Sequence, residues 1–111
     1  MIYVLPGVLT TALVQKLQAA FDSGPFVDGA QTVGSTNARR KRNEEIQTSS
    51  ALRKELAAEV RQALLAHNDF NLIAQPRHVG DVLLSRYRDG MFYGDHVDNT
   101  IMGRRSGSIW R

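Results

Sequence analysis

Near the end of the chain, a histidine and an aspartate two residues apart could bind one metal ion together. They are His96 and Asp98, within the sequence Gly94-Asp95-His96-Val97-Asp98. On an extended strand, side chains at positions i and i+2 point to the same side of the backbone, so both could reach one ion. Two histidines and one carboxylate hold Fe(II) while leaving coordination positions open for a co-substrate and dioxygen. The pair therefore predicts two of the three protein ligands of a non-haem iron site.

The residues before this pair favour the extended conformation that it requires. Gly80 and Gly90 bracket an apolar and aromatic run over residues 82–87, which is typical of a strand. Arg88-Asp89-Gly90 is typical of a turn, so a hairpin or a bulged corner is expected before His96. A histidine in such a pair is more often a surface or hydrogen-bonded residue, and the pair needs support from its context.

Five spaced residues supply that context: Tyr87, Gly90, Tyr93, His96 and Asp98 form the pattern Tyr-x-x-Gly-x-x-Tyr-x-x-His-x-Asp. The pattern resembles the iron-binding strand of the prolyl 4-hydroxylase-like branch of the Fe(II)/2-oxoglutarate-dependent dioxygenase superfamily. The chain as a whole, over residues 1–101, resembles the N-terminal portion of bacterial PKHD-type hydroxylases. That wider resemblance also rests on Pro6-Gly7-Val8-Leu9-Thr10, Phe26-Val27-Asp28-Gly29 and Gly94-Asp95-His96-Val97-Asp98-Asn99.

The resemblance implies a function and a role for individual residues. His96 and Asp98 would ligate Fe(II), and Tyr87 would line the 2-oxoglutarate pocket. Two roles stay open for Tyr93, packing behind the metal ligands or ordinary packing in a strand. No catalytic residue is implied beyond the metal ligands. The implied reaction hydroxylates a C–H bond of an unknown small-molecule or peptidyl substrate with dioxygen and 2-oxoglutarate. It releases succinate and CO2, and L-ascorbate keeps the iron reduced.

The end of the chain departs from the family pattern. In the family, a distal histidine and an arginine or lysine that pairs with 2-oxoglutarate come several strands later, but only thirteen residues follow Asp98 here. His67 and His78 precede the expected core strands and are poor substitutes. We expect a truncated dioxygenase domain over residues 1–101 and an atypical basic tail over 102–111, such as a frameshift produces. Reading the coding DNA in other frames would test this, and we expect little or no turnover from the chain itself.

The expected fold class is α+β. The resemblance implies that two N-terminal helices support the first strands of a double-stranded β-helix, or jelly roll, whose C-terminal half is missing. Residues 2–8 are a candidate short strand, and residues 26–48 contain two short strands at most. An unpaired strand over residues 79–87 would expose free backbone groups, so marginal stability or self-association is expected.

The first helix is expected to begin at Thr10 or Thr11, because either hydroxyl can accept from an amide of the first turn. Asp22-Ser23-Gly24-Pro25 should end it, with Gly24 able to adopt the left-handed conformation of a C-terminal cap. Its apolar face would consist of Leu13, Val14, Leu17, Ala20 and Phe21.

A second helix is expected to begin after Ser49 or Ser50 and to end near His67. His67 would be a cation at the helix end or simply exposed, and His78 would lie in a loop. The residues expected to be buried are Leu52, Leu56, Val60, Ala63 and Leu64. Those expected to face water are Arg53, Lys54, Glu55, Glu59 and Arg61.

Composition narrows the class of protein. The chain has no cysteine, which excludes disulfides and thiolate metal sites, and no apolar run of membrane-spanning length. A signal peptide is not expected either. We therefore expect a cytoplasmic location. The net charge of +3 resides in Arg104, Arg105 and Arg111, and nucleic-acid binding is therefore not expected. Arg39-Arg40-Lys41-Arg42, followed by acidic residues, is expected to be a solvated loop or strand edge.

Two other classes of protein are alternatives to an oxygenase. A non-catalytic interaction module could pair with another chain through exposed strand edges. A cupin-like metal protein would need a His-x-His strand, which the sequence lacks. The effect of His96→Ala or Asp98→Ala on metal binding separates an oxygenase from an interaction module, because the latter should be indifferent to both changes.

Overall fold

The computed structural model describes residues 1–32, 41–96, 102–105 and 108–110 of the chain. Its helices are α1 (Thr11–Ser23), the 3-10 helix η1 (Gly29–Thr32), α2 (Ala51–Ala66) and α3 (Asn68–Ala74). Its strands are β1 (Phe26–Asp28), β2 (Lys41–Arg42), β3 (Glu44–Ile46), β4 (Ser85–Arg86), β5 (Phe92–Tyr93), β6 (Met102–Arg105) and β7 (Ser108–Trp110).

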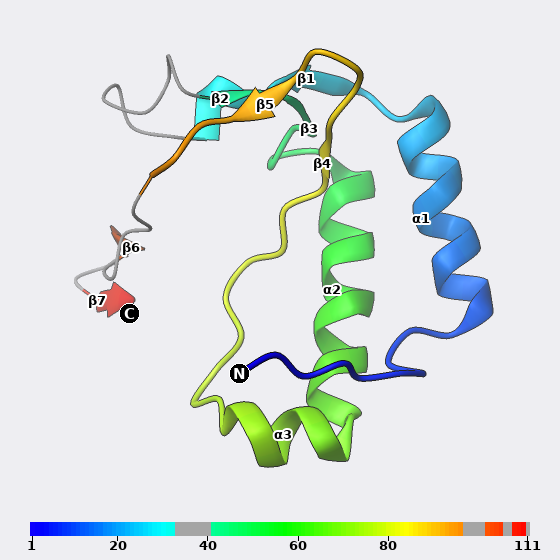
Figure 1. Ribbon diagram of the computed structural model, residues 1–111, viewed down its shortest axis with the longest axis vertical. Coiled ribbons are helices and arrows are strands. Elements are labelled where there is room, and N and C mark those ends of the chain that lie inside the picture. Colours follow the sequence, from blue (N-terminus) through cyan, green and yellow to red (C-terminus); the bar gives the residue numbers. More distant parts are fainter. Residues whose placement is uncertain (33–40, 97–101, 106–107, 111) are drawn as a thin grey trace.

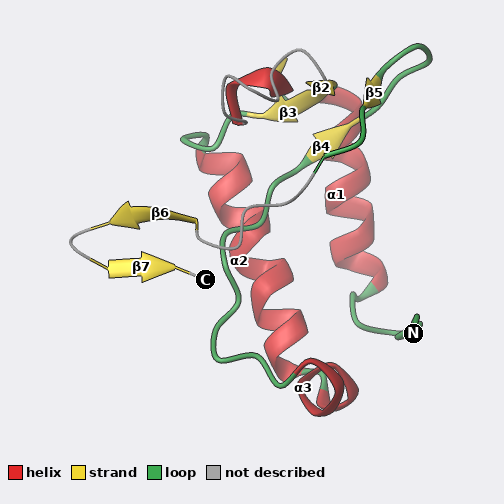
Figure 2. Cartoon of the chain, turned by 60° about the vertical axis from the view of Figure 1, so that its left-hand side comes forward, coloured by secondary structure: helices red, strands yellow, loops and turns green. Residues whose placement is uncertain are grey.

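Helices α1 and α2 lie side by side, and strands β1 to β5 gather at one end of this pair while α3 lies at the other (Figure 1). Figure 2 shows the same arrangement from another side. All strand pairs are antiparallel: β1-β3-β4 form one sheet, β2 pairs with β5, and β6 pairs with β7. The predicted α+β class is confirmed. The jelly roll stays a prediction, because the described strands form only small sheets.

Helix α1 begins as its sequence predicts. The Thr10 Oγ1 accepts a hydrogen bond from the Leu13 backbone N–H at 3.1 Å, which satisfies one amide of the first turn. Leu13 and Ala20 are buried, but Val14 is 38% exposed, so its predicted burial is wrong. The left-handed cap predicted at Gly24 is also wrong, since φ is −71° and ψ is 164°. A Cβ at this position would lie 2.3 Å from the Ala20 carbonyl oxygen, and close approach explains the glycine.

The hydrophobic core joins both long helices to the strands. Leu13 and Ala20 of α1, Ile46 of β3, Leu56 of α2 and Leu84, just before β4, form one buried cluster. The backbone N–H of Ile46 also donates to the Leu84 carbonyl at 3.0 Å. Ile46 therefore joins strand β3 to the hydrophobic core through its side chain and to Leu84 through its backbone.

Helix α2 differs from its prediction on one face. Ser50 is its N-cap, with Oγ 3.4 Å from the Arg53 backbone nitrogen, and Leu56 is buried as predicted. Arg53 was expected to face water but is only 4% exposed, whereas Leu52 was expected inside and is 36% exposed. The segment from α3 to β4 runs back along α2 and supplies polar partners for Arg53, which makes its burial possible (Figure 1).

Helix α3 was not anticipated, and it changes the role of His67. The His67 Nδ1 accepts a hydrogen bond from the Phe70 backbone N–H at 3.3 Å, so the side chain caps α3. The ring nitrogen thus serves as a hydrogen-bond acceptor at the start of α3, a role that the sequence did not predict for His67. Histidine is not among the residues preferred at a helix N-cap, so the sequence at His67 did not indicate that a helix begins there.

The predicted strands also need correction. Residues 2–8 form no strand, and three strands rather than two at most lie between α1 and α2 in the described part of residues 26–48. The unpaired strand predicted over 79–87 is wrong, because its only regular part, Ser85–Arg86, pairs with β3 through Glu45↔Ser85 and Glu44↔Arg86. Self-association stays an untested prediction. No helix among the described residues combines the length and the apolar character that a bilayer span needs.

Candidate functional site

His96 has a defined ring orientation in the structure. Strand β5 ends at Tyr93, so the strand predicted to carry His96 does not reach it. The His96 side chain is exposed, and its Nδ1 lies 2.8 Å from the Gly94 carbonyl oxygen. Because a carbonyl oxygen can only accept, this contact requires a proton on Nδ1, so that Nε2 is the nitrogen with the lone pair whenever the ring is neutral. A backbone carbonyl bound to one nitrogen is the usual arrangement behind a metal-ligating histidine.

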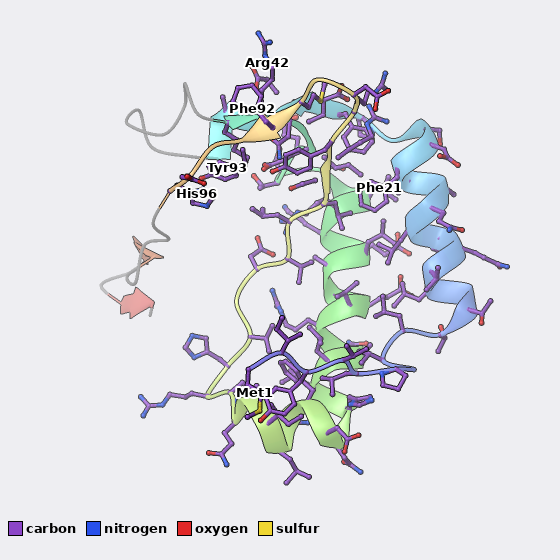
Figure 3. The ribbon with its side chains drawn as sticks, in the orientation of Figure 1. Met1, Phe21, Arg42, Phe92, Tyr93 and His96 are labelled. Atoms are coloured by element: carbon purple, nitrogen blue, oxygen red, sulfur yellow. The ribbon has the colours of Figure 1, made fainter. Side chains whose placement is uncertain are left out.

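Tyr93 packs directly against this ring. The two ring centroids are 3.7 Å apart, the planes differ by 12°, and Figure 3 shows the two side chains together beside β5. Tyr93 itself is half-buried. Of the two roles left open for Tyr93, the contact supports packing behind a candidate ligand.

The turn before β5 is present as predicted. The Met91 N–H donates to the Arg88 carbonyl at 2.9 Å, and Gly90 has φ of +82°, a conformation that favours glycine. Tyr87, which precedes the turn, is 50% exposed. Its assignment to a 2-oxoglutarate pocket stays a prediction.

The other proposed ligand, Asp98, lies outside the described residues. Among the residues that the structure describes, no group of three His, Asp or Glu side chains could hold a metal ion. His67 uses Nδ1 as a helix cap, and His78 is exposed in a loop, as predicted. Of the two proposed ligands, only His96 lies in the described part of the chain, and its assignment as a ligand stays a prediction.

Sequence reasoning missed a buried ion pair beside this site. The basic run 39–42 was expected to be solvated, but Lys41 is only 8% exposed and pairs with Glu45, which is 2% exposed. The Lys41 Nζ also lies 5.3 Å from the centroid of the Tyr93 ring. Arg42 is exposed as expected, whereas residues 39–40 lie outside the described part of the chain. The sequence carries no signal of this burial, because Lys41, Arg42, Glu44 and Glu45 are all charged. The pairing of β2 with β5 and of β3 with β4 decides which of them face inward.

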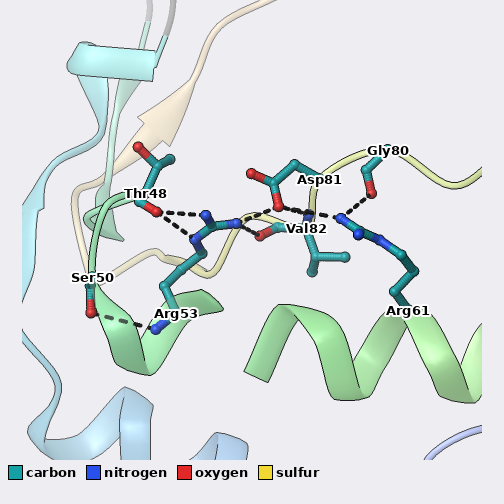
Figure 4. A network of polar contacts seen from close by, with 7 residues as sticks. All are labelled: Thr48, Ser50, Arg53, Arg61, Gly80, Asp81 and Val82. Carbon is teal, nitrogen blue, oxygen red and sulfur yellow. Dashed lines mark hydrogen bonds and ion pairs between the residues drawn. The ribbon is translucent and has the colours of Figure 1, made fainter. Parts of the chain in front are cut away.

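A second network holds the segment that leads into the site. The guanidinium of Arg53 donates to the Thr48 carbonyl, to the Val82 carbonyl at 3.1 Å and to Asp81 Oδ1 at 2.5 Å (Figure 4). Arg61 donates to the Gly80 carbonyl at 3.2 Å. These contacts fix the backbone just before β4 against α2, and β4 continues into the turn and β5.

The Arg53 network predicts a specific acid sensitivity. Partial burial acts to raise the pKa of Asp81, but the hydrogen bond and charge of Arg53, with smaller contributions from the Val82 backbone N–H and the charge of Arg61, lower the pKa below its ordinary value. A lowered pKa in the folded state contributes stability above the unfolded pKa, about 3.9, that is lost as the pH falls through the folded value. Asp81→Asn should therefore flatten the fall in the free energy of unfolding below about pH 4, measured by urea titration at several pH values. Asp22→Asn, at an exposed position, is the control, and equal pH profiles for Asp81→Asn and the wild type would contradict the assignment.

Comparison with known proteins places the chain in a class. Curated relatives named PKHD-type hydroxylase occur in several bacteria. The one from Maricaulis maris is 37% identical over 95% of this chain and 48% of its own length. The one from Acaryochloris marina is 38% identical over 93% of this chain and 47% of its own length. The one from Caulobacter vibrioides is 41% identical over 87% of this chain and 43% of its own length.

The chain is therefore related to hydroxylases, and the predicted resemblance to PKHD-type hydroxylases is confirmed. It spans about half the length of the curated relatives it matches, which fits an N-terminal portion. One relative, from Gloeothece citriformis, is 33% identical over all 111 residues and so aligns with residues 102–111 as well. The division at residue 101 and the foreign origin of the tail stay predictions. No family model and no solved structure matches the chain.

Proposed function

We propose that the chain supplies part of an Fe(II)- and 2-oxoglutarate-dependent hydroxylase in which His96 and Asp98 are metal ligands. The relatives named PKHD-type hydroxylase support the class. The observation that carries the assignment is the contact of His96 Nδ1 with the Gly94 carbonyl, because it orients an exposed ring so that Nε2 is the nitrogen that binds a metal when the ring is neutral. A neutral, oriented imidazole is the form in which histidine binds Fe(II).

The residue types fit the proposed cofactors. An imidazole and a carboxylate are two members of the donor set that non-haem Fe(II) oxygenases use, and a second histidine completes it. When bound, Fe(II) with 2-oxoglutarate would supply the oxidation of a substrate C–H bond by dioxygen, with succinate and CO2 as co-products and L-ascorbate as reductant. The chain's own contribution would be to orient His96 through Gly94 and Tyr93. Tyr87 is the proposed contact of 2-oxoglutarate.

Metal binding tests the proposal, with Mn(II) as a redox-stable and paramagnetic substitute for Fe(II). Added Mn(II) should broaden the backbone amide signals of Tyr93, Gly94 and His96 in NMR spectra before those of helix α1, because relaxation falls steeply with distance from the ion. His96→Ala and Asp98→Ala should each weaken the Mn(II) affinity at least about 10-fold, because each removes a ligand. His78→Ala, at an exposed loop histidine, is the matched control and should bind as the wild type does.

The same experiment judges the alternative function. An interaction module that pairs through strand edges would show no selective broadening near His96 and would be indifferent to His96→Ala and Asp98→Ala. The sheet β1-β3-β4 offers only short strands for edge pairing, three residues in β1 and two in β4. Short edges give a partner few backbone hydrogen bonds, so we place the hydroxylase first.

A further inference from the structure

We propose that Lys41 is a positioning residue for His96 and acts through the ring of Tyr93. The inference rests on the proposed function, because it assigns Lys41 to the support of a metal ligand. Lys41 and Glu45 are both almost fully buried beside the candidate ligand, and the hydroxylase assignment does not explain why. Charged side chains are rarely buried unless they are paired, and their removal from water must be offset by specific contacts.

The contacts form a continuous line from the three-stranded sheet to His96. The Ser85 Oγ of β4 lies 3.4 Å from Glu45 Oε1, and Glu45 of β3 is paired directly across the sheet with Ser85. The same Glu45 oxygen pairs with the Lys41 ammonium. The Lys41 Nζ in turn lies 5.3 Å from the centroid of the Tyr93 ring, within the range of a cation–π contact.

The last two steps connect Lys41 to the candidate ligand. Lys41 of β2 and Tyr93 of β5 are direct cross-strand partners, so their side chains lie on the same face. The Tyr93 ring stacks on the His96 ring at 3.7 Å between centroids. His96 lies beyond the end of β5, which is Phe92–Tyr93. The Tyr93 ring, pinned by Lys41, and the Gly94 carbonyl together fix the direction of Nε2.

The NMR shifts of the His96 ring protons test this link without any metal. Protons above the face of an aromatic ring resonate upfield, so the wild-type His96 protons should lie upfield of those in a disordered peptide. Tyr93→Leu should return them to the disordered-peptide values, and Lys41→Met should move them part of the way. Lys41→Arg keeps the cation and should retain the wild-type shifts. Arg42→Met, at the exposed neighbour, is the control.

Mn(II) affinity tests the functional consequence. Lys41→Met should weaken Mn(II) binding about 10-fold, the loss typical of a residue that orients a ligand, whereas Lys41→Arg should restore it. Because Lys41→Met leaves Glu45 buried without its lysine, the double variant Lys41→Met/Glu45→Gln keeps the test valid if the single variant unfolds. The double variant should show the same displaced His96 shifts and the same loss of affinity.

The role of Lys41 would be overturned if Lys41→Met, or the double variant where the single one unfolds, kept the wild-type His96 shifts and the wild-type Mn(II) affinity. The proposed function would then remain intact. Absence of selective Mn(II) binding in the wild-type chain would overturn the metal site and the positioning role together. A loss of affinity in Lys41→Met that Lys41→Arg does not restore would also overturn the proposal, because the cation would then be irrelevant.

Discussion

Replacing Arg53 with methionine should lower the free energy of unfolding by about 3 kcal/mol, although the apolar replacement keeps much of the side-chain volume. Arg53 is 4% exposed and satisfies the carbonyls of Thr48 and Val82 together with the Asp81 carboxylate. Methionine offers none of these hydrogen bonds, so the two carbonyls and the Asp81 carboxylate lose the group that joins them to α2. Urea unfolding monitored by circular dichroism at pH 7 would measure the change.

Lys54→Met is the matched control for Arg53→Met. Lys54 is the next residue of α2 and is exposed, so its replacement should change the free energy of unfolding by less than about 0.5 kcal/mol. Equal effects of the two replacements would contradict a structural role for Arg53. Arg53→Met should also increase hydrogen exchange of the amides over 81–86 above that of the control, because the network joins this segment to α2.

Replacing Ile46 with alanine should lower the free energy of unfolding by about 3–4 kcal/mol. Ile46 is 1% exposed and contributes to the cluster that joins α1, β3, α2 and Leu84. Removing three carbons from the centre of that cluster loses burial of apolar surface and leaves a cavity that the surrounding helices fill only in part. A stability loss of this size is a large fraction of the total for a chain of 111 residues.

Leu72→Ala supplies the control for Ile46→Ala. Leu72 is 71% exposed on α3, and its replacement should change the free energy of unfolding by less than about 0.5 kcal/mol. The measurement is again urea unfolding at a single pH, with the slope of the transition compared between variants. A loss below about 1 kcal/mol for Ile46→Ala would show that β3 is not packed in the core as described.

The features predicted correctly from the sequence depend on neighbouring residues. Thr10 caps α1 because its hydroxyl reaches an amide three residues later, and Gly90 takes a positive φ in a turn over residues 88–91. The spacing of Tyr87, Gly90, Tyr93, His96 and Asp98 pointed to the hydroxylase class that the relatives confirm. Such patterns are visible in sequence because their physical cause acts within one or two turns of chain.

The features that sequence reasoning missed depend on partners far along the chain. Arg53 was placed in water because it is charged and lies outside the apolar face expected for α2, yet Asp81 and Val82, 28 and 29 residues later, make its burial favourable. The strand predicted over 79–87 proved mostly irregular because its backbone is held by Arg53 and Arg61 rather than by a sheet. No local pattern announces a partner at that distance.

The candidate site divides in the same way. The sequence alone nominated the candidate iron ligands, since His96 and Asp98 were chosen by their type, their spacing and the family resemblance around them. Only the tertiary structure decided how His96 is held, because the Tyr93 ring is stacked on it and the buried Lys41–Glu45 pair stands behind that ring. The physical reason is that a donor atom belongs to its residue, whereas its orientation and the burial of the charges around it depend on contacts between strands that the chain brings together only on folding.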